Sequence, residues 1–203
     1  MTTRRWLPTG DVSELPDYAF GPTSLGYWGV VGFMLIEGMG FILALGVYFY
    51  LLRNEANWPP HSAPPPLFWS TVFTVVAVLS EIPNRWLEEK ARRQDTRAVR
   101  IGILLLIGFG LALIVLRGFE MHAMNVRWDV TAYGSIVWAL LALHTFHTIT
   151  DVYDSGVLAA ILIPQKIDGR RFSDVLDNAM YWRFIVWSWV ILYVTIYWTP
   201  RWV

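Results

Sequence analysis

Long apolar runs separated by short polar stretches organise the chain. A helix that crosses a bilayer needs about 20 mainly apolar residues. Five stretches meet this length, at about 25–51, 67–86, 99–119, 132–163 and 180–199. The runs are continuous rather than alternating, which favours helices over the strands of a membrane barrel. The pattern therefore predicts an all-α integral membrane protein, with a single five-helix domain over 25–203 after an N-terminal tail of residues 1–24.

Composition agrees with a membrane location. Hydrophobic residues make up 55% of the 203 residues and charged residues only 16%, with a mean hydropathy of +0.42. Soluble domains carry about 25% charged residues. The formal net charge is zero, so no bulk attraction to nucleic acid is expected. The sequence contains no cysteine, which excludes disulfides, Cys-bound zinc and iron–sulfur clusters.

The distribution of Lys and Arg predicts how the helices are oriented, because cytoplasmic loops carry an excess of these residues. With five spans, the N-terminal tail shares one side with the loops after the second and fourth spans. That side carries twelve basic residues: Arg4, Arg5, Arg85, Lys90, Arg92, Arg93, Arg97, Arg100, Lys166, Arg170, Arg171 and Arg183. The other side carries four: Arg53, Arg117, Arg127 and Arg201. We therefore expect the N-terminus inside, with a cytoplasmic tail, and the C-terminus outside.

The fourth span contains several ionisable residues, which are costly in hydrocarbon and need partners. His144, His147 and Asp151 share one helical face, and Asp154 follows them. Glu37 lies near the middle of the first span. Because the first and fourth spans run antiparallel, Glu37 and His144 fall at about the same depth. We predict a hydrogen bond between these two side chains.

Ion pairs are expected at the inner ends of the spans. Glu81 and Arg85 are four residues apart around Pro83, the spacing of a helical ion pair. Asp151 lies toward the inner end of the fourth span, where Arg183 and the basic loop after the second span are its expected partners. We expect these contacts to be structural.

The histidines do not form a clear ligand set. A haem in a helical bundle needs ligands from two helices at one depth, whereas His144 and His147 share one helix and His61 and His122 lie outside the spans. The Glu-x-x-His motif of di-iron bundles is missing. We therefore expect no metal, no cofactor and no catalytic site in this chain. A small proton channel or transporter that uses the embedded acids and histidines is an alternative, and a membrane enzyme that uses the histidines is another.

Four motifs follow one another in the first, third and fourth spans. LIEGMGF contains Glu37, RGFEMHAM contains Glu120, Tyr133–Gly134–Ser135 begins the fourth span, and HTFH contains His144 and His147. Together they resemble subunit III of haem–copper respiratory oxidases (cytochrome c oxidases). In this resemblance Glu37 and Glu120 fall on two Glu residues of the family, and the other two motifs match its YGS and its H-x-x-H.

The last span extends this resemblance. Its segment YWRFIVWSWVILYVTIYW follows the family's aromatic pattern. Arg183 stands where the family has His, and Val186 stands where it has Asp. These departures indicate a divergent branch, in the short five-helix form of the subunit.

The resemblance implies a non-catalytic accessory subunit of an aerobic respiratory oxidase in the bacterial inner (plasma) membrane. Such a subunit packs against subunit I, binds phospholipid between its helices, and supports proton uptake and stability of the complex. Haem and copper are then expected in the partner subunits. The family's embedded polar residues, linked to lipid or protons, would be Glu37, Glu120, His144 and His147. A subunit-III-like accessory protein of a nitric oxide reductase system is the alternative within this resemblance.

Overall fold

The computed structural model describes residues 25–60, 62–164 and 169–203, so the predicted tail lies outside it. The described residues form α1 (Leu25–Asn54), α2 (Leu67–Arg92), α3 (Thr96–His122), α4 (Ala132–Leu162), α5 (Gly169–Tyr193), the π-helical turn η1 (Val194–Trp198) and α6 (Thr199–Trp202). Within them, five helices are long and apolar enough to cross a membrane, the last comprising α5, η1 and α6. This confirms the predicted five-helix, all-α membrane class.

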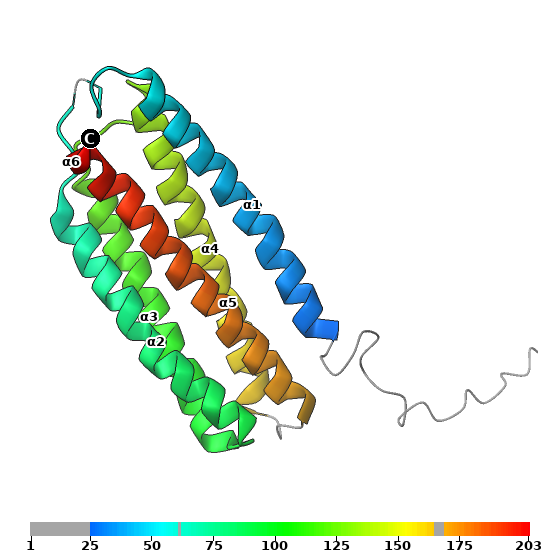
Figure 1. The fold of residues 1–203 in the computed structure, drawn as a ribbon. Coiled ribbons are helices and arrows are strands. Elements are labelled where there is room, and N and C mark those ends of the chain that lie inside the picture. The colour runs from blue at the N-terminus through cyan, green and yellow to red at the C-terminus, as the bar shows by residue number, and fades with distance from the viewer. Residues whose placement is uncertain (1–24, 61, 165–168) are drawn as a thin grey trace, which may run out of the picture.

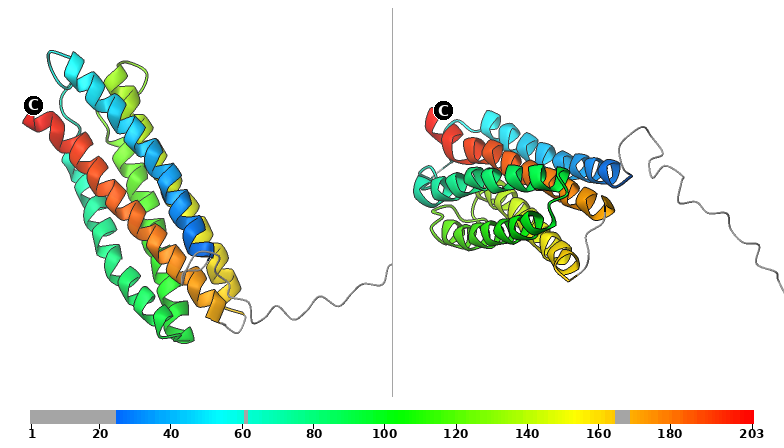
Figure 2. Two further views of the ribbon diagram at one scale, coloured as in Figure 1. Left: turned by 45° about the vertical axis from the view of Figure 1, so that its right-hand side comes forward. Right: turned by 90° about the horizontal axis from the view of Figure 1, so that it is seen from below.

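Four of the helices form an antiparallel bundle, and α1 lies outside it (Figures 1 and 2). Helix α2 packs against α3 and α5, and α4 packs against the same two helices from the other side. Helix α1 contacts α4 and α5. Only 6% of its most apolar window is buried, compared with 50% for the last span. Helix α1 is therefore held by two neighbours, and most of its surface is exposed.

Several helices extend beyond their apolar runs. Helix α2 continues to Arg92, where Glu88 and Arg92 form an i,i+4 ion pair of 2.8 Å. Helix α5 begins at Gly169 rather than near 180. Its added turns bury Phe172 and Val175, so the core-facing side of the helix continues beyond the span. The predicted boundaries missed these turns because charged residues interrupt the apolar sequence while the helical period persists.

Local sequence explains where the helices begin. The side chain of Asp95 accepts a hydrogen bond from the Ala98 N–H at the start of α3, and Thr131 does the same for Gly134 at the start of α4. A Cβ at Gly134 would lie 2.0 Å from the carbonyl oxygen of Arg127, so only glycine fits there. These caps fix the position of α4, which carries the two core histidines.

Candidate functional site: polar clusters inside the bundle

Arg117 of α3 is the centre of the first polar cluster and is only 2% exposed. Its guanidinium lies between the rings of Phe73 and Trp189, with 3.9 Å from its carbon to each ring centroid. Its terminal nitrogens donate to Glu120, at 2.6 Å, and to His144 Nδ1, at 3.1 Å. Two aromatic faces and a carboxylate thus replace the water that the cation loses.

The partners of Arg117 fix the protonation of the neighbouring histidine. Because Arg117 can only donate, His144 Nδ1 must accept, and the ring proton lies on Nε2. Nε2 is 3.1 Å from the Ile185 carbonyl oxygen, to which it donates. Glu120 also accepts a hydrogen bond from the hydroxyl of Tyr197, which η1 presents to it. The Arg117 cluster is therefore an ion pair with a neutral histidine.

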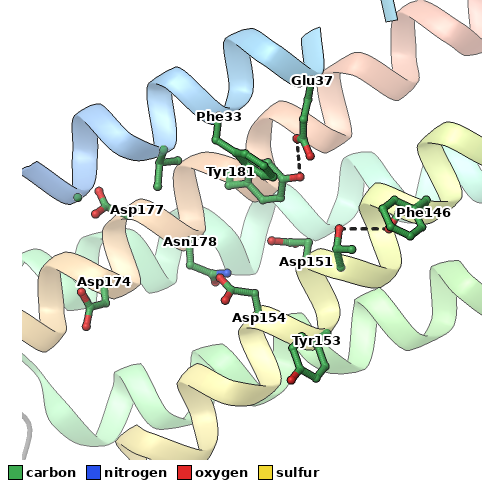
Figure 3. A pocket seen from close by; sticks show the side chains of 13 residues that line it. Phe33, Glu37, Phe146, Asp151, Tyr153, Asp154, Asp174, Asp177, Asn178 and Tyr181 are labelled. Carbon is green, nitrogen blue, oxygen red and sulfur yellow. Dashed lines mark hydrogen bonds between the residues drawn. The ribbon is translucent and has the colours of Figure 1, made fainter. Parts of the chain in front are cut away.

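The second cluster corrects the predicted Glu37–His144 hydrogen bond. Glu37 instead contacts His147, with 3.0 Å between Oε1 and Nε2, and its Oε2 accepts a 2.6 Å hydrogen bond from Tyr181 of α5 (Figure 3). Residues three apart on a helix are rotated by about 60° and displaced by about 4.5 Å along the axis. His147 therefore faces α1, while His144 faces the bundle interior. The depth estimate was wrong by about one helical turn.

The Glu37–His147 pair can hold one proton near the middle of α1. His147 Nδ1 lies 2.7 Å from the Leu143 carbonyl oxygen and must donate to it. One further proton then lies between Nε2 and the Glu37 carboxyl group. The pair is either imidazolium with carboxylate or imidazole with carboxylic acid, and both forms are neutral overall. Phe41 packs against His147, with ring centroids 5.1 Å apart, and is itself buried.

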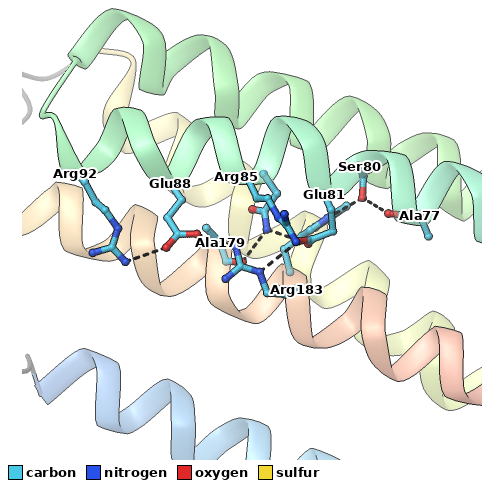
Figure 4. A network of polar contacts seen from close by, with 10 residues as sticks. Ala77, Ser80, Glu81, Arg85, Glu88, Arg92, Ala179 and Arg183 are labelled. Carbon is cyan, nitrogen blue, oxygen red and sulfur yellow. Dashed lines mark hydrogen bonds and ion pairs between the residues drawn. The ribbon is translucent and has the colours of Figure 1, made fainter.

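A third network joins α2 to α5 (Figure 4). Arg183 donates to Glu81 at 3.2 Å and to Glu88 at 2.7 Å. Glu81 also accepts a 3.1 Å hydrogen bond from Asn84. The expected pair Glu81–Arg85 has a longer separation of 3.9 Å, and the Arg85 side chain is 70% exposed. Arg183 is therefore the principal partner of the buried Glu81 carboxylate.

The expected contact between Asp151 and Arg183 is not formed. Arg183 is engaged by the two α2 carboxylates, on the side of α5 that faces α2. Asp151 is 0% exposed, and within the described residues neither of its carboxyl oxygens has a hydrogen-bond partner. It lines a cavity of about 500 Å³ between α1, α4 and α5, together with Asp154. The sequence analysis singled out both aspartates and predicted basic partners for them, but the structure places them in the lining of this cavity.

Arg117 is the main functional residue that the sequence reasoning misplaced. The charge count places it among the basic residues of the outer side, whereas the structure buries it inside the bundle. Its three-residue spacing to Glu120 was the available signal. Tyr181 and Tyr197 were recognised only as members of an aromatic pattern. Their hydroxyls donate hydrogen bonds to the partly buried Glu37 and to the buried Glu120, and no spacing along one helix indicates these contacts.

Metal binding finds no support in the geometry. In the parts of the chain that the structure describes, no group of three or more His, Asp or Glu side chains could hold a metal ion. What the clusters can do is place protons and charges at defined depths and join the helices.

Comparison with known proteins gives these clusters a context. No protein-family model matches the chain. It is 24% identical over 178 residues to cytochrome c oxidase subunit 3 of Cyanidium caldarium, covering 84% of the chain. It is 24% identical over 182 residues to the protein of that name from Corynebacterium diphtheriae, and 19% over 170 residues to the one from Thermostichus vulcanus, in each case over 83% of the chain. The chain is therefore similar to cytochrome c oxidase subunit III over most of its length.

The extent of the match differs between these subunit III relatives. The chain spans just under two thirds of the Cyanidium caldarium and Chondrus crispus proteins, at 66% and 65% of their lengths. It spans 85% of the Corynebacterium diphtheriae and Thermostichus vulcanus proteins. The residues on which the sequence resemblance rests lie in two clusters: Glu37 contacts His147, and Glu120 is linked to His144 through Arg117.

Proposed function

We propose that this chain is a non-catalytic accessory subunit of a haem–copper cytochrome c oxidase. In this proposal it packs against the catalytic subunit I, supports the stability and proton uptake of the complex, and takes part in aerobic respiration. Haem and copper are held by the partner subunits. The observation that carries the proposal is the similarity to proteins named cytochrome c oxidase subunit 3 over 83–84% of the chain.

The proposal includes a bacterial inner membrane and a cytoplasmic N-terminus. The start of α1, the α2–α3 loop and the start of α5 lie at one end of the bundle (Figure 1). Among the described residues, Lys90, Arg92, Arg93, Arg97, Arg100 and Arg171 lie at that end. Because Arg117 is buried in the bundle, three rather than four basic residues remain at the opposite end. The charge asymmetry supports placing the α2–α3 end in the cytoplasm.

A phospholipid is proposed for the groove between α1 and α5. This cavity of about 470 Å³ has an almost entirely apolar lining, which includes Gly38 of α1 and Phe184 and Trp187 of α5. Arg183 lies at the same groove and its side chain is 35% exposed. Apolar walls suit an acyl chain, while the Arg183 guanidinium is already engaged by Glu81 and Glu88.

Co-purification with an optical spectrum tests the oxidase assignment. The tagged chain is isolated from its native membrane in a mild detergent, and the reduced-minus-oxidised spectrum of the eluate is recorded. Subunit I and its haem bands are expected with the tagged chain, and no haem with the chain after it is separated from its partners. Recovery of nitric oxide reductase subunits in place of an oxidase would overturn the assignment, and so would a haem-free eluate without subunit I.

A matched pair of glycine variants tests the lipid groove. A Cβ at Gly38 meets only the Phe184 ring, at 3.8 Å, so Gly38→Leu should fold and fill the groove. A Cβ at Gly40 has no atom within 4 Å, and Gly40 does not line the groove, so Gly40→Leu is the control. Native mass spectrometry should show loss of a retained phospholipid in Gly38→Leu alone. Equal retention in both variants would contradict the proposed lipid position.

A further inference from the structure

The cavity between α1, α4 and α5 has a strongly one-sided charge (Figure 3). It lies toward the α2–α3 end of the bundle and holds about 500 Å³, within the usual range for small-molecule sites. No Lys, Arg or His is among its described lining residues, whereas five lining residues carry carboxyl groups: Glu37, Asp151, Asp154, Asp174 and Asp177. The described lining therefore offers an anion no cationic partner.

Asp151 is the one of these carboxyl groups that is both buried and unpartnered. Glu37 is engaged by His147 and Tyr181, and Asp174 lies 3.2 Å from Arg171. Asp151 has no exposed surface, and both of its oxygens lack a hydrogen-bond partner among the described residues. Figure 3 shows its carboxyl group directed from α4 toward α5. A buried carboxyl group without a partner is costly, so a donor that enters this cavity gains a strong interaction.

The remaining walls select the type of donor. Phe33, Phe146, Tyr153 and Tyr181 line the cavity. Aromatic faces attract organic cations, and their apolar surface accommodates an alkyl group. A bare divalent cation such as Ca²⁺ needs six to eight oxygen ligands, and within the described residues no His, Asp and Glu cluster is close enough to hold a metal ion. Carboxyl groups combined with aromatic rings instead suit an ammonium group that carries an organic substituent.

We propose that this cavity binds an organic ammonium group, with Asp151 as its principal acceptor. Asp154 and Asp177 add negative potential within the same cavity, and the aromatic rings contact the alkyl part. Two sources present the same chemistry: a freely diffusing amine and the ethanolamine headgroup of a membrane lipid. The proposal rests on the residues of this chain and is independent of its assignment to an oxidase.

Calorimetry on the full chain in detergent tests the free-amine source. n-Hexylammonium chloride is the probe, and n-hexanol is the uncharged control. The ammonium compound should bind and hexanol should not. Asp151→Asn should weaken binding roughly tenfold to a hundredfold, as expected for the loss of a charge-assisted hydrogen bond. Asp129→Asn, in the α3–α4 loop, should bind as the unmodified chain does.

Lipid nanodiscs test the headgroup source. The chain is reconstituted with equal amounts of phosphatidylethanolamine and phosphatidylglycerol, and retained lipids are identified by native mass spectrometry. Selective retention of phosphatidylethanolamine that Asp151→Asn abolishes would support the proposal and assign the source to lipid. Binding of hexylammonium without such retention would support it with a diffusing amine as the source.

A second variant keeps the proposal testable if Asp151→Asn does not fold. Val30→Trp fills the cavity from α1 while leaving Asp151 unchanged, and circular dichroism verifies its helix content. It should lose the same binding. The proposal is overturned if neither ammonium source binds the unmodified chain, or if binding persists unchanged in Asp151→Asn or in Val30→Trp. A purely structural role for Asp151 would lower the unfolding temperature without changing affinity, which is also contrary to the proposal.

Discussion

Two polar regions of the bundle, the Arg117 cluster and the Asp151 cavity, accommodate buried ionisable groups differently. Arg117 contacts Glu120, His144 and two aromatic rings, so its charge is compensated by side chains from α2, α3, α4 and α5. Among the described residues, Asp151 has no such partner, and it lines a cavity. The first arrangement joins four helices through side-chain contacts. The second leaves a hydrogen-bond acceptor for a ligand that enters the cavity.

Among the substitutions considered, removal of Arg117 should cause the largest loss of unfolding free energy. Arg117→Met leaves the Glu120 carboxylate buried without its cation, which costs about 3–5 kcal/mol of unfolding free energy. Denaturation followed by circular dichroism in detergent measures the loss. The double variant Arg117→Met/Glu120→Gln should recover a substantial part, because no uncompensated charge remains. A double variant as unstable as the single variant would show that the arginine acts through packing alone.

Arg183 should matter more than Arg85 in the α2–α5 network. Arg183→Met removes the closer cation from buried Glu81 and should cost about 1–3 kcal/mol. Arg85→Met removes an exposed side chain 3.9 Å away and should cost less than about 0.5 kcal/mol. The same unfolding assay compares them. Equal losses would mean that the 3.9 Å contact is as important as the direct hydrogen bond.

The Glu37–His147 pair should be coupled energetically. Glu37→Gln and His147→Gln, singly and together, should show a coupling free energy of about 0.5–2 kcal/mol, because the two side chains meet at 3.0 Å. Glu37→Gln with Glu120→Gln is the control cycle, since those residues share no partner and should be additive within about 0.5 kcal/mol. Additive effects in the first cycle would contradict a direct hydrogen bond between Glu37 and His147.

Asp151→Asn should be nearly neutral for folding when ligand and lipid are removed. No hydrogen bond from the described residues is lost, so the unfolding free energy should change by less than about 1 kcal/mol. Unfolding of the detergent-purified, delipidated variant measures this. A loss of unfolding free energy as large as that of Arg117→Met would show that Asp151 is as important for folding as Arg117.

The smallest effect is expected at the exposed pair Arg127–Asp129 in the α3–α4 loop. A hydrogen bond from Arg127 lowers the pKa of Asp129 below its ordinary value. A depressed carboxyl pKa adds stability above the ordinary value, and this is lost as the pH falls through the folded-state pKa. Unfolding temperatures of wild type and Arg127→Gln, measured from pH 7 downward, should differ slightly and then converge below about pH 4. A difference that grows in acid would contradict this sign.

The sequence by itself determined the helices, because each apolar run is long enough to span a bilayer and a backbone in hydrocarbon must bond internally. It also identified Glu37, Glu120, His144 and His147 through their motifs. Their partners could not be read in this way. A three-residue offset on α4 decides whether a histidine faces α1 or the bundle interior, and rotation of each helix is set by packing with its neighbours.

Only the tertiary structure decided where the charges lie. In sequence, Arg117 lies near the end of an apolar run and counts among the basic residues of the outer side, but packing places it between Phe73 and Trp189. Arg183 and Asp151 are both near the same end of the bundle, yet α5 turns Arg183 toward α2 and away from Asp151. Spacing along one helix specifies which residues share a face. Which residues that face contacts depends on packing between helices, and the sequence of one apolar run does not specify this packing.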